Sequence, residues 1–164
     1  MGFKMHILEK FEINKANSEL ERIREKQGIA FIKKFIKEYE NANKQKRNQD
    51  FMKISSSFYL LRCQGSRRKE AISEIEIKDK ISESSVSNHI TKLNSLVKAN
   101  RAKYDILCKE LEYEIIRRSK DRWFSYTKSI EEKAKREGIA YKLCEAIFFK
   151  YVLEENKQKL LISY

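Results

Sequence analysis

The chain contains no proline among its 164 residues and only four glycines. Proline removes a backbone hydrogen-bond donor and clashes with the preceding turn of a helix, so a chain without it lacks the strongest helix breaker. Proteins use proline at about 5% on average, which makes its absence unusual. We therefore expect long helices, interrupted at glycines and at polar segments.

Two helices are predicted in the N-terminal third from apolar residues at helical spacing. Residues 29–42 carry an aromatic-rich apolar stripe with lysines opposite, which is typical of a core or dimer surface. Residues 49–63 form the second helix, which Gly65 ends. The polar segment 41–50 is predicted to be a linker or a solvated helix end. Residues 1–48 are thus expected to form an N-terminal helical extension.

The segment 72–93 is predicted to be a helix-turn-helix. Ile72 and Ile75 mark the inner face of its first helix. Its second helix, over 84–97, buries a stripe that recurs every three or four residues: Val86, Ile90, Leu93 and Val97. Short polar side chains occupy the positions between these. One serine serves as the N-cap of this helix, but capping does not account for several serines in one turn.

Residues 112–128 are predicted to form a β-hairpin. Tyr113, Ile115 and Trp123 favour strands, and Ser119-Lys120-Asp121 can supply the turn. Before the hairpin, the apolar spacing from Tyr104 to Leu111 also permits a helix over 101–111, or a prolonged helix continuing from 84–97.

The pattern from Ser82 to Leu93 (Ser-Glu-Ser-Ser-Val-Ser-Asn-His-Ile-Thr-Lys-Leu) resembles the helix-turn-helix of ArsR-type and MarR-type winged-helix repressors. The sequence departs from that family at Glu76, Asp79 and Lys80, in the first helix and the turn. The resemblance implies a mainly α fold with a small β-hairpin wing, flanked by N- and C-terminal helical extensions. It also implies that helix 84–97 lies in the DNA major groove and that hairpin 112–128 is the wing.

The net charge of +12 favours an acidic partner: nucleic acid first, an anionic membrane surface second. Solvated faces on a soluble helical protein remain an alternative. Candidate DNA contacts are cations, which suit phosphates, and short polar groups, which suit base edges. They are Arg67, Arg68, Lys69, Ser84, Ser85, Ser87, Asn88, Thr91, Lys92, Arg117, Arg118, Lys120 and Arg122.

Neither a cofactor nor a catalytic centre is expected. The three cysteines are widely spaced and include no CxxC pair, which argues against disulfides and a structural zinc site. His89 is expected to be structural rather than a metal ligand. No phosphate-binding loop or nucleophile elbow occurs, so we expect a non-enzyme. With no signal peptide or apolar run of about 18 residues, we expect a cytoplasmic protein that does not contact membranes.

The favoured hypothesis is a sequence-specific reader of double-stranded DNA, a dimeric transcriptional regulator. Its domains would be the N-terminal extension 1–48, the winged helix 49–128 and a C-terminal helix 129–164 for packing or dimerisation. The N- and C-terminal helices would form the homodimer. One alternative is a plasmid or phage replication or partition protein. Another is a non-enzymatic module that docks an acidic protein partner.

Overall fold

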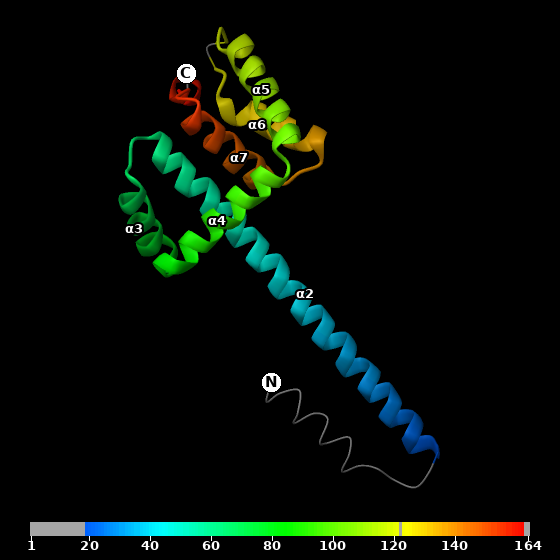
Figure 1. Cartoon of the computed structure of the whole chain (residues 1–164). Coiled ribbons are helices and arrows are strands. Elements are labelled where there is room, and N and C mark those ends of the chain that lie inside the picture. The colour runs from blue at the N-terminus through cyan, green and yellow to red at the C-terminus, as the bar shows by residue number, and fades with distance from the viewer. Residues whose placement is uncertain (1–18, 122, 163–164) are drawn as a thin grey trace. The chain divides into compact units, whose positions relative to one another are not determined.

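The computed structural model describes residues 19–121 and 123–162, and the described chain is helical throughout, with no strand (Figure 1). The helices are α2 (Glu19–Cys63), α3 (Arg68–Asp79), α4 (Glu83–Ala99), α5 (Arg101–Arg118), α6 (Tyr126–Glu137) and α7 (Tyr141–Glu154), followed by the 3-10 helix η1 (Gln158–Leu161). The chain divides into two units, Met1–Asn48 and Gln49–Tyr164. Helix α2 contributes residues to both.

In the unit 1–48, the described residues all belong to α2. The helix predicted over 29–42 is present within it. The segment 41–50, predicted to be a linker or a solvated helix end, is solvent-exposed but is neither a linker nor a helix end, because α2 runs through it. The segment contains no proline or glycine, so nothing in its sequence stops a helix from running through its polar residues.

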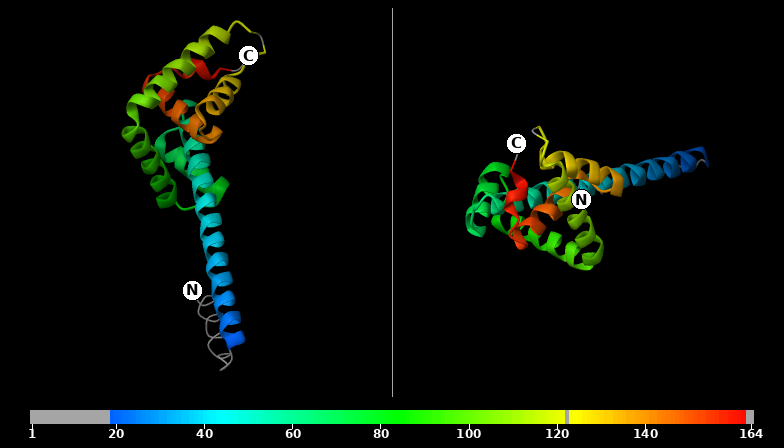
Figure 2. Two further views of the ribbon diagram at one scale, coloured as in Figure 1. Left: turned by 90° about the vertical axis from the view of Figure 1, so that its right-hand side faces the viewer. Right: turned by 90° about the horizontal axis from the view of Figure 1, so that it is seen from above.

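The unit 49–164 is built around α7, which is the most apolar of the described helices. Phe148, Phe149 and Val152 of α7 are each at most 1% exposed. They pack with the last turns of α2 and with α4, α5 and α6 in one continuous core. Figure 2 shows the ribbons of α5, α6 and α7 lying close together. The wide apolar stripe of the C-terminal helix is therefore covered within the chain itself.

The β-hairpin predicted over 112–128 is wrong, and with it the winged-helix fold. Residues up to Arg118 continue α5, and α6 begins at Tyr126, so only a short turn lies between them. Leu111 and Ile115 are at most 4% exposed and continue the helical spacing begun by Tyr104, Leu107 and Cys108. Burial at this spacing outweighs the local strand preference of Tyr113 and Ile115, because strand propensity depends strongly on context.

Helix α6 begins one turn earlier than its sequence suggests. The sequence Ser129-Ile130-Glu131-Glu132 has the Ser-x-x-Glu pattern of a capping box, which predicts a helix that starts at Ser129. Ser129 instead lies inside α6 and is fully buried, while Ser125 is the residue at the N-cap. Glycines are expected to interrupt the helices, and such a break is present at Gly138. Gly138 ends α6 with φ +66°, a left-handed conformation that glycine adopts without steric cost.

Candidate nucleic-acid interface

Helices α3 and α4 form a tight corner. Lys80 ends α3 in the left-handed conformation, with φ 53°, and Ser82 caps α4 by accepting a 3.2 Å hydrogen bond from the backbone N–H of Ser85. Across the corner, Ile75 of α3 and Ile90 of α4 are each 1% exposed in the shared core. Two helices joined by a short turn thus occupy the segment predicted to be a helix-turn-helix, and the second helix begins at Glu83.

One face of α4 points to solvent and is entirely polar. Ser84, Asn88, Thr91 and Lys92 are exposed, whereas Ser85 and Ser87 are half-buried at its edges. Val86, Ile90 and Leu93 lie on the opposite side and are at most 1% exposed. An α-helix that packs on the core through its apolar stripe and exposes a polar face has dimensions that fit a DNA major groove.

The serines at the start of α4 also bond to one another. The Ser82 hydroxyl lies 3.2 Å from the Ser84 hydroxyl and donates a 2.9 Å hydrogen bond to that of Ser85. These contacts explain the presence of Ser84 and Ser85, because both are hydrogen-bond partners of the capping residue Ser82. Asn88 and Thr91, further along the face, are the candidate base-reading groups whose side chains show no such local use in the described structure.

Lys92 and His89 contact the last part of α2. The Lys92 ammonium lies 4.6 Å from the centre of the Phe51 ring, a cation–π geometry that orients the lysine along the helix surface. The His89 ring centroid lies 6.3 Å from that of the same phenylalanine. Burial lowers the pKa of His89, which favours the neutral imidazole, as expected of a structural histidine.

Three exposed cations, Arg67, Arg68 and Lys69, stand at the start of α3. The backbone N–H of Arg67 donates a 3.1 Å hydrogen bond to Glu70, and this carboxylate satisfies one of the free donors at the helix start. The Arg68 guanidinium carbon lies 5.6 Å from the centre of the Phe58 ring. The charges of these residues remain at the surface, where they can face an anion.

The predicted contacts Arg117, Arg118 and Lys120 lie elsewhere, at and after the end of α5. Arg118 binds Glu132 of α6 at 2.7 Å, and this hydrogen bond raises the pKa of its guanidinium. Arg117 and Lys120 are exposed, and Arg122 is outside the described residues. Arg117, Arg118 and Lys120 lie at or just after the C-terminal end of α5, which is the end furthest from α4 (Figures 1 and 2). The two ends of this 18-residue helix are about 27 Å apart. These three residues and the α4 face do not form one surface.

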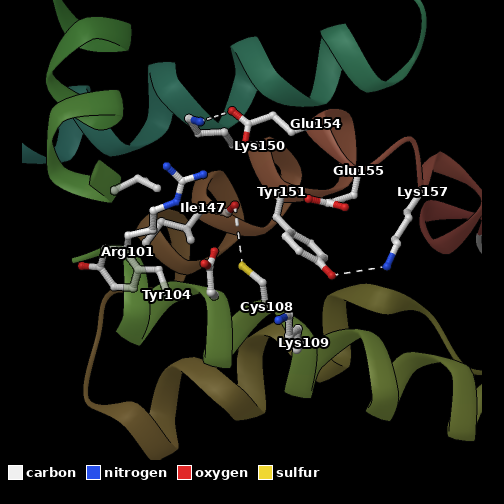
Figure 3. A pocket seen from close by; sticks show the side chains of 12 residues that line it. Arg101, Tyr104, Cys108, Lys109, Ile147, Lys150, Tyr151, Glu154, Glu155 and Lys157 are labelled. Carbon is white, nitrogen blue, oxygen red and sulfur yellow. Dashed lines mark hydrogen bonds and ion pairs between the residues drawn. The ribbon is translucent and has the colours of Figure 1, made fainter. Parts of the chain in front are cut away.

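A cavity of about 290 Å³ lies where the C-terminal end of α4 meets α5 and α7 (Figure 3). The sequence did not reveal its charged network, because the partners are 39 and 45 residues apart. The Tyr151 hydroxyl donates a 2.6 Å hydrogen bond to Glu112, whose carboxylate also lies 2.7 Å from the Lys157 ammonium. Burial acts to raise the pKa of Glu112, but the hydrogen bonds from Lys157 and Tyr151 outweigh it and hold that pKa below its usual value.

The cavity contains no activated nucleophile among its lining residues. Burial raises the pKa of the Cys108 thiol, so the group stays protonated and unreactive. Tyr151 has its pKa raised by burial and by its bond to Glu112. Lys150 and Lys157 are each neutralised by a carboxylate. Among residues 19–121 and 123–162, no cluster of three or more His, Cys, Asp or Glu side chains that could hold a metal ion is present.

No protein-family model, curated protein or solved structure matches this chain. In the described part of the chain, no helix is long and apolar enough to cross a membrane.

Proposed function

We propose that the protein binds double-stranded DNA through a wingless helix-turn-helix, with α4 in the major groove. The observation that carries the proposal is the wholly polar outward face of α4, held against the core by Val86, Ile90 and Leu93. Asn88 would pair with adenine, since the asparagine amide matches the donor and acceptor on that base edge. Thr91 would contact a neighbouring base.

Arg67, Arg68 and Lys69 would contact phosphates. They lie at the start of the first helix of the corner, an element that in helix-turn-helix proteins crosses the DNA backbone while the second helix enters the groove. Cations are not needed at a helix start for stability, because they oppose the helix dipole. Phosphate binding gives these three side chains a use that helix formation does not.

Glu83 limits how α4 approaches the duplex. It is the first residue of α4 and is exposed. Its carboxylate interacts favourably with the helix dipole but repels phosphate. The very start of α4 therefore stays away from the backbone, and the contacts fall one to two turns further, at Asn88, Thr91 and Lys92.

The role proposed for the protein is that of a non-enzymatic, cytoplasmic transcriptional regulator that acts as a dimer. Without a wing, specificity rests on the few side chains of one helix face. Two copies reading two half-sites would double that information. The charge of the chain, +12, would supply non-specific affinity that falls steeply with salt.

The test begins with selection of bound sequences from a random duplex pool by the full chain. Binding of the selected duplex and of a scrambled duplex is then compared for Asn88→Ala. We expect about tenfold or greater loss for the selected duplex and little for the scrambled one. Asn43→Ala, which removes an exposed asparagine from α2, is the matched control. Equal affinities of native protein and Asn88→Ala for the selected duplex would refute the assignment of α4.

The phosphate contacts are tested by the salt dependence of binding. The triple variant Arg67→Ala/Arg68→Ala/Lys69→Ala should weaken binding to both duplexes and flatten the logarithmic salt slope by about one unit per lost contact. Lys33→Ala/Lys34→Ala/Lys37→Ala, which removes three exposed lysines from α2, controls for the loss of three charges alone. A triple variant with an unchanged slope would remove this part of the interface.

A further inference from the structure

The cavity where α4 meets α5 and α7 has an apolar floor. Tyr104, Cys108 and Ile147 line it and are at most 7% exposed, and Val97 of α4 lies half-buried beside them. The volume of the cavity, about 290 Å³, is close to the lower end of the range of small-molecule sites, about 300 Å³. The cavity therefore suits a ligand smaller than a typical cofactor, with an apolar part that covers the floor.

The two lysines that the C-terminal part of the chain contributes to the rim of the cavity are paired. Lys150 forms an ion pair with Glu154, and the Lys157 ammonium lies 2.7 Å from a carboxylate oxygen of Glu112. These groups already satisfy one another, so they do not need a ligand.

Arg101 and Asp105 of α5 also line the cavity, and both are exposed. They are four residues apart, which is the spacing at which opposite charges on a helix form ion pairs. In the described part of the chain, however, neither side chain makes an ion pair or a hydrogen bond. Figure 3 shows Arg101 beside Tyr104 at one end of the cavity, with Lys157 at the other end. One positive and one negative group, about 6 Å apart along the helix axis, are thus open to a ligand at the same end.

We propose that this cavity binds a free α-amino acid with an apolar side chain. Its carboxylate binds the Arg101 guanidinium, which matches a carboxylate through two parallel hydrogen bonds. Its ammonium binds the Asp105 carboxylate. An α-amino acid has both charged groups on one carbon atom, as two receptors one helical turn apart require. Its side chain extends from there over Cys108 and Ile147.

The charges of the rim favour a zwitterion over a simple anion or cation. Lys109 and Glu155 also line the cavity, and their side chains have no partner in the described structure. Together with Arg101 and Asp105 they make two unpaired cations and two unpaired carboxylates, whose charges cancel although the chain carries +12. A ligand with a net charge would be attracted by two of these groups and repelled by the other two.

The inference depends on Arg101, Asp105 and the apolar floor, and not on DNA binding. The ligand is measured without DNA, and none of the residues proposed to contact DNA lines the cavity. A failure of this proposal therefore leaves the assignment of α4 unchanged, and the reverse holds as well.

The experiment is saturation-transfer difference NMR on the full chain, with leucine, isoleucine, valine, methionine and phenylalanine as the probes. We expect at least one of them to bind with a dissociation constant of about 1 mM or lower, as suits so small a ligand. Two analogues of the tightest probe are then compared, one without the amino group and one without the carboxylate. Each should bind about tenfold more weakly or worse, because each loses a charge-assisted hydrogen bond.

Two variants locate the site. Arg101→Gln and Asp105→Asn should each raise the dissociation constant of the tightest probe about tenfold or more. The matched control is Lys103→Gln, which alters an exposed lysine of α5 outside the cavity and should bind like the native chain. Far-UV circular dichroism verifies that each variant keeps its helix content.

Three results would overturn the proposal. The first is that none of the five amino acids binds at about 10 mM, well above the weakest affinity expected. The second is that either analogue binds as tightly as the amino acid itself. The third is that Arg101→Gln or Asp105→Asn leaves the affinity unchanged.

Discussion

The hydroxyl of Tyr59 in α2 donates a 2.6 Å hydrogen bond to the side-chain oxygen of Asn94 in α4. This bond joins the last turns of α2 to the middle of the helix proposed to enter the DNA groove. Tyr59 is 6% exposed, so its hydroxyl has little access to water as a substitute partner. The orientation of α4 therefore depends on α2 as well as on the corner with α3.

Replacing Tyr59 by phenylalanine should lower the free energy of unfolding by about 1 kcal/mol at neutral pH, the usual worth of one such hydrogen bond. Burial raises the pKa of Tyr59 from 10.0 to about 12. The folded state thus holds this proton more tightly than the unfolded state, and stability falls as pH rises from 10 to about 12. Urea unfolding at several pH values should show a smaller alkaline loss for the variant. Tyr113→Phe, at a tyrosine that is 69% exposed, should leave the neutral-pH midpoint unchanged.

Removal of the cap of α4 should lower the stability of the fold by weakening the start of this helix. Ser82→Ala deletes the acceptor for the backbone N–H of Ser85 and should cost about 1 kcal/mol. Ser95→Ala, on the exposed face of the same helix, should cost less than half as much. Thermal unfolding of the two variants provides the comparison. Equal stabilities would mean that the serine cluster does not hold the start of α4.

Glu112→Gln should reduce stability in a pH-dependent way. The folded state lowers the pKa of Glu112 below 4.5, so its contribution is present above that pH and is lost as pH falls further. We expect a loss of about 1 kcal/mol at pH 7, since the pair with Lys157 is partly exposed. The difference from the native chain should shrink in urea unfolding below pH 4. A difference that stays constant with pH would contradict the ionised pair.

Glu83→Gln should strengthen binding to any duplex. The change removes a negative charge from the start of α4, where it opposes approach of the phosphate backbone. We expect affinity for scrambled duplex to rise a few-fold at low salt and the gain to disappear at high salt, because the repulsion is screened. Fluorescence anisotropy measures both. Glu131→Gln, at an exposed glutamate of α6, should leave the affinity unchanged if the effect is local.

The sequence predicted the corner of α3 and α4 because one apolar stripe on α4 determines it. Val86, Ile90 and Leu93 recur at helical spacing, and all three are buried. Their spacing also places Asn88 and Thr91 on the exposed side, as expected. That these two side chains contact bases stays a prediction.

The sequence failed where local preference and long-range packing disagree. Tyr113, Ile115 and Trp123 favour strands, but α5 is fixed by burial of Leu107, Leu111 and Ile115 against α7 and its neighbours. The same limit hid the network of Glu112, Tyr151 and Lys157, whose members meet only after α7 packs on α5. The predicted start of α6 was also wrong, because the buried Ser129 and the N-cap residue Ser125 cannot be told apart in sequence.

The central claim, that α4 contacts the duplex while the turn after α5 does not, is tested most directly by affinity cleavage. An iron–EDTA reagent is attached to Ser95→Cys, on the exposed face of α4 two turns after Asn88, or to Lys120→Cys. The native thiols interfere little, because burial raises the pKa of Cys63 to about 11 and of Cys144 to about 12, and Cys108 is 2% exposed. We predict cleavage of the selected duplex from position 95 and none from position 120. Cleavage from position 120 with none from position 95 would contradict the account.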